Sequence, residues 1–308
     1  KSVPMRKDSL FHMASNTKPV VATAILQLVE AGKLGLDDEV RKHIPPFDQG
    51  DAARITIRQL LNHTSGFRIN SLFLNPLMKP SAQHPDAPNL RLEASRFGEV
   101  GPKVKPGTTY SYSNPGYNTL GALVEIASGM SLSEYLNQRV YAPLGMVDTC
   151  NHEPLADPKR MSALFRREGE GWRISWRPGG PPKVPFPRAS GGMISTAADY
   201  AVFCQMFLDG GVRGESRLLS QAHVREATTP QNRHVFSETE RDDPGHRFYG
   251  LGWRVRGRIF SHGGSDGTFA WVDPERAVVG LVFTQSTGSV NPKAQFMRVV
   301  AAACKDDG

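Results

Sequence analysis

The chain has 308 residues, of which 39% are hydrophobic and 22% charged, a composition typical of folded globular proteins rather than disordered ones. No apolar run reaches the roughly 18 residues that span a bilayer, and no charged-then-apolar leader opens the sequence, so we expect a soluble mature chain, either exported or cytoplasmic. The formal charge of +7 could attract nucleic acid, but Lys and Arg are scattered without a basic helix, which favours a solvated basic surface.

The three cysteines, Cys150, Cys204 and Cys304, are odd in number and widely spaced. This spacing predicts buried thiols rather than a disulfide framework. None of the nine histidines stands at metal-ligand spacing, so we expect neither a metal ion nor another cofactor.

Apolar residues at helical spacing predict a first helix over residues 19–32, buried along one face, with Gly32 as its C-cap. Shorter helical patterns follow at residues 56–62, 118–128 and 132–140, the last opened by Ser131 and Glu134 at capping-box spacing. Residues 68–107 are rich in Pro, Asn and Ser with little periodicity, which predicts a long loop that acts as a lid or a binding-site wall.

Residues 153–192 are rich in Pro, Gly and Arg and predict two short strands, at 161–166 and 172–176. Trp172 and Trp176 fit core packing and a substrate wall equally well. Helices are predicted at 197–208, with Thr196 and Asp199 at the start, and at 221–228.

The periodicity changes near the C-terminus. Four short segments are rich in aromatic and β-branched residues and are bounded by Gly or Asp-Pro, at 249–255, 258–261, 268–272 and 277–284. They predict an antiparallel meander, after which Asn291 and Pro292 provide the N-cap and the first residue of a helix to residue 303. Helices first and strands last indicate an α+β fold.

Ser15-Asn16-Thr17-Lys18 stands where the first helix is predicted to begin. A serine there can cap the helix, because its oxygen accepts from unpaired backbone N–H groups. Alternatively, residues three apart lie on one helix face, so the Lys18 amine can reach the Ser15 hydroxyl and take its proton. Burial would favour the neutral amine that this chemistry requires. The motif alone is compatible with both interpretations.

Two further motifs also have two interpretations each. Tyr112-Ser113-Asn114 precedes a predicted helix, and alternate residues of an extended segment point the same way, so Tyr112 and Asn114 can face one cavity. The alternative is a turn with tyrosines packed at its rim.

His262-Gly263-Gly264 ends a predicted strand, where glycine lets a substrate backbone approach the strand edge. The alternative there is a glycine hairpin with an incidental histidine.

The stretch from Gly263 to Gly267 also fits the Gly-x-Ser-x-Gly pattern of a nucleophile elbow. That elbow needs a strand-to-helix turn and a catalytic histidine later in the chain. Here the next segment is strand-like and no histidine follows His262, so we reject an α/β-hydrolase interpretation.

The three motifs occur in the order and context found in serine β-lactamases and penicillin-binding proteins. Longer phrases extend the match from about Leu10 to the C-terminus: "LLNHTSGF" from Leu60, "YSNPGYNTLGALVE" from Tyr112, "YAPLGM" from Tyr141, "SGGMISTAADYAVF" from Ser190 and "SHGGSDG" from Ser261. The chain resembles this superfamily, specifically the branch of class C β-lactamases, D-amino-acid peptidases and related carboxylesterases. The resemblance implies an α+β fold with an antiparallel sheet flanked by helices. It also implies a mostly helical subdomain at roughly 35–165 and an α/β subdomain from roughly 1–34 plus 166–308.

The resemblance also implies roles for individual residues. Ser15 would attack a carbonyl and form an acyl-enzyme, with Lys18 as general base or its electrostatic partner. Tyr112 would pass a proton to the leaving group, and whether Lys18 or Tyr112 takes the first proton stays open. Asn114 would hold Lys18 and a substrate oxygen. Backbone N–H groups of Ser15 and Ser265 would form the oxyanion hole beside the substrate-binding strand end His262-Gly263-Gly264.

Two departures from the family pattern refine these expectations. His262 and Gly263 replace the Lys-Thr-Gly or Lys-Ser-Gly that recognises a substrate carboxylate, which favours an uncharged acyl substrate, although a histidine can still charge near neutral pH. Only 14 residues precede Ser15, where the family usually has two strands, so we expect either a smaller sheet with an exposed edge or strands that were removed. His63, in a turn, is expected to support the floor of the site.

The sequence therefore predicts a serine hydrolase without a cofactor, acting through Ser15 on a small-molecule ester, amide or lactam. A carboxylesterase on small esters is the leading hypothesis, and a D-amino-acid peptidase or β-lactamase is the alternative. A non-catalytic binding or assembly module on the same fold is an alternative of another class. The oligomeric state stays open.

Overall fold

A computed structural model of the chain describes residues 4–68, 79–287 and 292–304. Its α-helices are α1 Thr17–Glu30, α2 Ile57–Leu61, α3 Leu90–Val100, α4 Asn114–Ser128, α5 Leu132–Leu136, α6 Ala142–Leu144, α7 Ala197–Leu208, α8 Gln221–Ala227, α9 Glu238–Asp242 and α10 Lys293–Ala303. Short helical turns are η1 Ala14–Asn16, η2 Val40–Lys42, η3 Pro45–Phe47, η4 Gly50–Arg54, η5 Asn137–Tyr141, η6 Glu153–Leu155 and η7 Arg233–Val235.

Within the described residues, the strands form one larger sheet and three small ones. The larger sheet is antiparallel, with the order β11-β10-β9-β8-β7. Its strands are β7 Phe248–Tyr249, β8 Arg254–Arg256, β9 Ile259–Gly263, β10 Thr268–Asp273 and β11 Val278–Phe283. The others are β1 Phe11–His12, β2 Leu164–Glu168, β3 Gly171–Trp176, β4 Ile194–Ser195, β5 Val212–Arg213, β6 Ser216–Arg217 and β12 Ser286–Thr287. The predicted α+β fold with a C-terminal antiparallel meander is confirmed.

One predicted strand of the meander is wrong in its bounds. Residues 249–255 form parts of two paired strands, β7 and β8, rather than one. The chain reverses at two glycines: Gly252 has φ +93°, and a side chain at Gly250 would overlap the carbonyl of Ala227. The aromatic residues that suggested one strand are buried on either side of this reversal.

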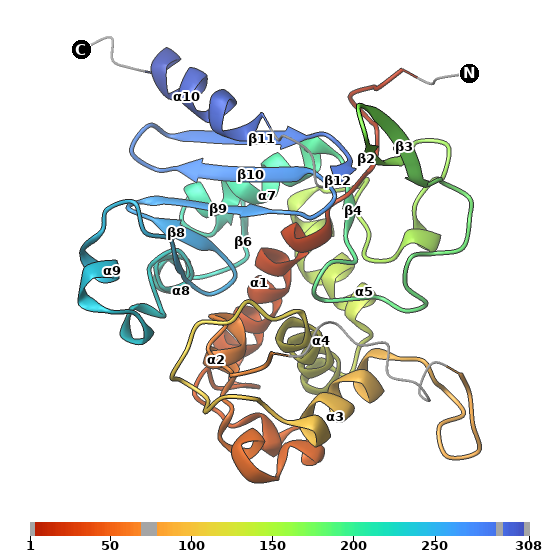
Figure 1. Cartoon of the computed structure of the whole chain (residues 1–308), viewed down its shortest axis with the longest axis vertical. Coiled ribbons are helices and arrows are strands. Elements are labelled where there is room, and N and C mark those ends of the chain that lie inside the picture. The colour runs from red at the N-terminus through yellow and green to blue at the C-terminus, as the bar shows by residue number, and fades with distance from the viewer. Residues whose placement is uncertain (1–3, 69–78, 288–291, 305–308) are drawn as a thin grey trace.

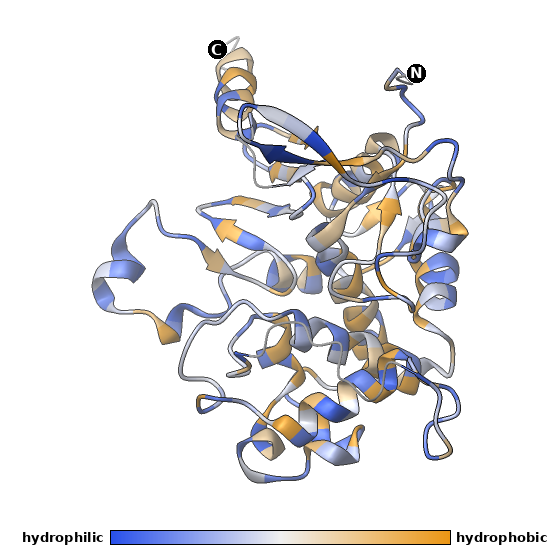
Figure 2. Ribbon diagram, turned by 45° about the vertical axis from the view of Figure 1, so that its right-hand side comes forward, coloured by the Kyte–Doolittle hydropathy of each residue, from blue (hydrophilic) through white to orange (hydrophobic). Residues whose placement is uncertain are grey.

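The two halves of the fold meet along α1. Figure 1 shows the sheet and α7 at one end, α2, α3 and α4 at the other, and α1 running between them. α1 contacts α4 and α5, while α7 packs against β10 and β11. Figure 2 shows hydrophobic residues along these interior elements and hydrophilic residues on the outer loops. The predicted bounds of the two subdomains remain a prediction.

Helix α1 is more buried than its pattern predicted. We expected burial along one face, but Lys18 and Thr23 are buried together with the apolar residues. A helix that is covered on most sides must satisfy its polar side chains internally. The Thr23 hydroxyl donates to the backbone carbonyl of Pro19, and Lys18 has partners described below.

The predicted loop at residues 68–107 is wrong, because helix α3 lies within it. The Asn89 side chain caps α3 by accepting from the backbone N–H of Leu92, and Leu90, Ala94 and Phe97 are buried at helical spacing. The stretch around these three residues is rich in polar residues, so the helical pattern was not recognised in the sequence. Residues 69–78 of the predicted loop lie outside the described residues.

Helix ends and cysteines bring smaller corrections. α4 begins at Asn114 instead of residue 118, and α10 begins at Lys293 with Pro292 as N-cap, while Asn291 lies outside the described residues. Cys204 is buried as predicted, but Cys150 is partly exposed, and Cys304 is exposed because it follows α10, which buries none of its residues. The thiols are free. Among the described residues, no helix is long and apolar enough to cross a membrane.

Candidate active site

Ser15 lies in the turn η1, directly before α1, and does not cap the helix. The N-cap of α1 is Asn16, and neither η1 nor α1 has a side-chain cap. Ala14, the residue before Ser15, has φ +45°, a left-handed conformation that costs a non-glycine residue free energy. Such strain concentrates at functional sites. The capping interpretation of Ser15 therefore has no support in the geometry.

The Lys18 amine is buried against three oxygen atoms. Its Nζ lies 3.0 Å from Ser15 Oγ, 2.8 Å from Asn114 Oδ1 and 2.7 Å from the backbone oxygen of Ser190. The side chain is fully buried, and burial lowers the pKa of Lys18 well below its usual value of 10.5. The positive charges of Arg188 and Arg254 lower the pKa further. The site thus favours the neutral amine.

Tyr112 also contacts the Ser15 hydroxyl. Burial raises the pKa of its phenol to about 12, although a hydrogen bond with Ser15 acts in the opposite direction. The Nζ atom of Lys18 lies 4.8 Å from the centre of the Tyr112 ring. The phenol therefore stays protonated across the pH range in which the amine titrates, and both groups contact Ser15.

The segment that carries Tyr112 and Asn114 is fixed by the start of α4. Ser113 caps this helix by accepting from the backbone N–H of Gly116, and its own backbone N–H donates to Nδ1 of His63. His63 is fully buried and packs against Tyr112 at a tilt, with 4.4 Å between ring centres. Burial lowers the pKa of His63 well below 6.5, so its ring is a neutral support for this segment.

Ser190 is a member of the site that the motifs did not predict. Its backbone oxygen accepts from Lys18, and its backbone N–H donates to Oδ1 of Asn118 at 3.0 Å. The amide nitrogen of Asn118 donates to Glu93 from α3. Burial raises the pKa of Glu93 to about 7. In the sequence, this segment was noted only because the phrase "SGGMIST" resembles the family; no chemical role was predicted for Ser190.

The turn between β9 and β10 brings Ser265 near Ser15, and both residues line one cavity. Ser15 is the second residue of η1, and the first N–H groups of a helical turn have no partner within it. Gly264 passes so close to η1 that a Cβ would overlap Thr268 Oγ1 and the carbonyl of Met13. Its backbone N–H donates to Thr268 at 2.7 Å, so this glycine serves the packing of the turn rather than leaving a free donor for a substrate.

His262 is buried beside Tyr112, with 6.3 Å between the centres of the two rings. It is fully buried, its Nε2 lies 2.8 Å from the Tyr249 hydroxyl, and its Nδ1 lies 3.0 Å from the carbonyl oxygen of Gly263. A carbonyl only accepts, so Nδ1 carries the proton and Nε2 accepts from Tyr249. Burial lowers the pKa of His262 well below 6.5, which favours the neutral ring at neutral pH.

A cavity of about 250 Å³ opens beside Ser15. Ser15, Asn114 and Ser265 line it, whereas Lys18, Tyr112, His262 and Gly263 do not. Its remaining lining includes the charged side chains Glu153, Lys183, Arg188 and Asp266. The structure thus brings together Ser15, Lys18, Tyr112, Asn114 and the turn at Ser265, while the ring of His262 is buried near Tyr112 and does not line the cavity.

The two tryptophans of residues 172–176 differ in their environments. Trp172 is exposed, so it is not core, and it is not among the cavity residues. Trp176 packs edge-on against His12, with 4.5 Å between ring centres, and against the small cluster that contains Leu10. Among the described residues, no group of three or more His, Cys, Asp or Glu side chains could hold a metal ion.

Comparison with known proteins identifies the family. Residues 1–303 match the family described as Beta-lactamase, so the chain belongs to the beta-lactamase family. It is 32% identical to penicillin-binding protein 4 of Amycolatopsis lactamdurans over 71% of this chain and 56% of that protein. It is 34% identical to the esterase EstB of Burkholderia gladioli over 63% of this chain and 50% of that protein. The chain thus spans about half the length of these relatives.

A solved structure supports the fold. A penicillin-binding protein homologue from Caulobacter crescentus superimposes with a TM-score of 0.78, covering 98% of this chain and 85% of that one at 21% identity. At this identity the likeness concerns the arrangement of helices and strands. It agrees with the antiparallel sheet flanked by helices described above.

Proposed function

We propose that the protein is a serine hydrolase that forms an acyl-enzyme through Ser15, acting on small carboxylic esters. The observation that carries this proposal is the contact of 3.0 Å between a buried amine, Lys18 Nζ, and Ser15 Oγ. A serine hydroxyl is a weak nucleophile until a neighbouring base takes its proton. Family membership supports hydrolysis as the reaction class.

The hydrogen bonds around Lys18 favour it as that base. A neutral amine has two N–H donors and one lone pair. The oxygens of Asn114 and Ser190 can only accept from it, so they take both N–H groups. The lone pair is then left to face the third neighbour, Ser15 Oγ. Of the two candidate bases, Lys18 has a lowered pKa and Tyr112 a raised one, so Lys18 takes the first proton.

The backbone N–H groups and Tyr112 act in the later steps. As Ser15 Oγ bonds to the substrate carbon, the backbone N–H groups of Ser15 and Ser265 stabilise the negative oxygen, each by about 3 kcal/mol of barrier. When the intermediate collapses, the leaving alkoxide takes the phenol proton of Tyr112, which the Lys18 ammonium restores. Water then attacks the acyl-enzyme, releases the acid and returns the proton to Ser15.

The environment of His262 favours an uncharged substrate. The strand end at which relatives of this type bind a carboxylate with lysine carries a neutral, buried ring that does not line the cavity. The relative named an esterase supports the same choice. Two cavity cations, Lys183 and Arg188, and the relative named a penicillin-binding protein support the alternative, a D-amino-acid peptidase or β-lactamase.

Hydrolysis rates separate these candidates. We would measure the release of p-nitrophenol from acetyl and butyryl esters, and opening of a penicillin, by the wild type and by Ser15→Ala. We expect ester turnover that falls by several orders of magnitude in Ser15→Ala. Ser128→Ala, at the far end of α4 from Asn114, serves as the matched control and should keep full activity. Turnover of penicillin but not of esters would favour the alternative.

No turnover of either substrate by folded wild type would contradict the proposal. It would favour the non-catalytic alternative, a binding or assembly module. In that case Ser15→Ala would keep the affinity of the protein for its partner, because no reaction at this hydroxyl would contribute to binding.

A further inference from the structure

Gln285 is a buried amide in an unusual backbone conformation, between β11 and β12. Its φ is +49°, and its side chain is fully buried. A non-glycine residue keeps a left-handed conformation when the surroundings fix it in place. A glutamine amide also has one acceptor and two donors, all of which need partners when they are buried.

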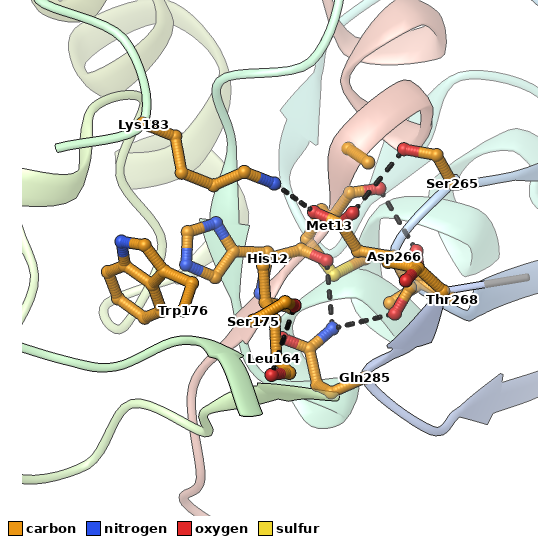
Figure 3. Close-up of polar contacts among 12 residues, drawn as sticks. His12, Met13, Leu164, Ser175, Trp176, Lys183, Ser265, Asp266, Thr268 and Gln285 are labelled. Atoms are coloured by element: carbon orange, nitrogen blue, oxygen red, sulfur yellow. Dashed lines mark hydrogen bonds and ion pairs between the residues drawn. The ribbon is translucent and has the colours of Figure 1, made fainter. Parts of the chain in front are cut away.

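All of the hydrogen-bonding groups of this amide are used at the active site. Oε1 accepts from the backbone N–H of His12 at 2.9 Å. Nε2 donates to the backbone oxygen of His12 at 3.0 Å and to that of Asp266 at 3.3 Å. Figure 3 shows Gln285 between these two segments. His12 stands three residues before Ser15, and Asp266 directly follows Ser265.

The pairing of β1 explains why His12 needs this partner. β1 has β4 on one side, where His12 lies opposite Ile194. The backbone groups of Ile194 are bonded to Cys150 instead, so His12 and Ile194 form a non-hydrogen-bonded pair. The N–H and C=O of His12 therefore point to the other side. There the Gln285 side chain forms the two backbone hydrogen bonds that a neighbouring strand would otherwise form with His12.

The turn that carries Ser265 has further ties to the same region. Thr268 Oγ1 donates to the carbonyl of Met13 at 3.0 Å, and Lys183 Nζ lies 2.9 Å from Asp266 Oδ2. The Thr268 bond joins the turn to η1, whereas the Lys183 bond joins it to the loop before Ser190 (Figure 3). Gln285 is the described side chain that bonds both the backbone before Ser15 and the backbone after Ser265.

We infer that Gln285 is a positioning residue: its amide sets the separation between the backbone N–H groups of Ser15 and Ser265 that together bind the oxyanion. This inference rests on the proposed function. The hydrogen bonds of the amide are to backbone atoms of His12 and Asp266 and not to Ser15 Oγ. Because a displacement of about 1 Å in a catalytic constellation can cost about 100-fold in rate, losing the amide should reduce kcat while the cavity that binds substrate stays intact.

The test compares Gln285→Met, which keeps the length but loses all three hydrogen bonds, with Gln285→Asn, which keeps the amide but shortens its reach. The control is Gln27→Met, since the Gln27 amide also bridges backbone carbonyls, of Arg139 and Leu218, from the far part of α1. We expect kcat for a short-chain p-nitrophenyl ester to fall about 10- to 100-fold in both Gln285 variants with KM changed less than about threefold. Gln27→Met should keep the wild-type kcat.

Two outcomes would overturn the inference. One is a folded Gln285→Met, or a folded Gln285→Asn if the first variant does not fold, with the kcat of the wild type. The other, independent of activity, is a pair of crystal structures in which wild type and variant have the same distance between the Ser15 and Ser265 nitrogens. If the wild type shows no Ser15-dependent turnover, the proposed function fails, and these structures alone decide the role of Gln285.

Discussion

The Nζ atom of Lys18 lies 2.8 Å from Oδ1 of Asn114, although 96 positions separate the two residues. Lys18 is on the first turn of α1 and Asn114 is the first residue of α4, and these two helices pack against each other. The amine is therefore held by the packing of the core rather than by a flexible loop. Its protonation state follows from that burial, which makes Lys18 the first residue to test.

Replacing Lys18 with arginine should sharply reduce ester turnover while keeping a positive charge. Guanidinium does not lose its proton in proteins, so it cannot act as the base. We expect kcat/KM to fall about 100- to 10,000-fold, the usual contribution of general base catalysis. Lys33→Arg, at an exposed position after α1, should have no effect.

The pH profile of the wild type checks the same assignment. The reaction needs a neutral amine, so kcat/KM should rise with pH through the pKa of Lys18 and then stay level. Because that pKa lies well below 10.5, the rise should occur well below 10.5. A rise centred near the usual lysine value would contradict a buried, neutral Lys18.

The phenol of Tyr112 should matter for kcat more than for folding. Tyr112→Phe keeps the ring that packs on His63 but removes the proton that reaches the leaving group. We expect kcat to fall about 100-fold or more and the thermal unfolding midpoint to stay close to that of the wild type. A leaving group that needs no proton, such as p-nitrophenolate, should be affected less than a simple alkoxide. Tyr135→Phe, in α5, is the matched control.

Adding a methyl group at Gly264 should destabilise the fold, whereas adding one at Gly263 should cost little unfolding free energy. A Cβ at Gly264 would overlap Met13 and Thr268, while at Gly263 its nearest contact is Phe269 at an ordinary 3.4 Å. We expect Gly264→Ala to lose about 1–3 kcal/mol of unfolding free energy, typical of overpacking, together with most activity. Urea unfolding and ester turnover measure both effects. Equal behaviour of the two variants would contradict the close approach of the turn to η1.

Glu93 should make stability fall as pH rises. Its pKa is raised from 4.5 in the unfolded chain to about 7 in the fold, so the folded state holds the proton more tightly. Stability is then fully present below pH 4.5 and partly lost as pH rises to about 7. Glu93→Gln removes this loss, and its advantage over the wild type should grow across that window by up to about 3 kcal/mol. A difference in unfolding free energy that does not change with pH would contradict the raised pKa.

The sequence predicted those parts of the fold whose signals are local. Helix α7 was predicted within its observed bounds because Thr196 caps it through Asp199, and the capping box of Ser131 and Glu134 lies where expected. Helix α3 was missed because its few apolar residues at helical spacing lie within a stretch rich in Pro, Asn and Ser. The meander was predicted correctly, but the reversal between β7 and β8 depends on the packing of Gly250 against a distant carbonyl.

In the site, too, contacts between residues close in sequence could be predicted, whereas contacts that depend on tertiary packing could not. Ser15 in η1 and Lys18 in α1 are only three residues apart, so their contact could be predicted from spacing. Other features of the site depend on tertiary packing and could not be predicted from a local residue pattern. They are the burial of His262, the contact of the Ser190 backbone oxygen with Lys18 and the hydrogen bonds of the Gln285 amide. The family motif described the position of His262 on its strand but not the direction of its ring.

The central claim is that Ser15 becomes acylated, and intact mass measures this directly. Wild type and Ser15→Ala would each be mixed with p-nitrophenyl acetate, quenched rapidly in acid and weighed by mass spectrometry. We expect the mass of one acyl group on the wild type, mapped to the peptide that contains Ser15, and none on Ser15→Ala. An equal adduct on both proteins, or release of p-nitrophenol by Ser15→Ala at the wild-type rate, would contradict an acyl-enzyme at Ser15.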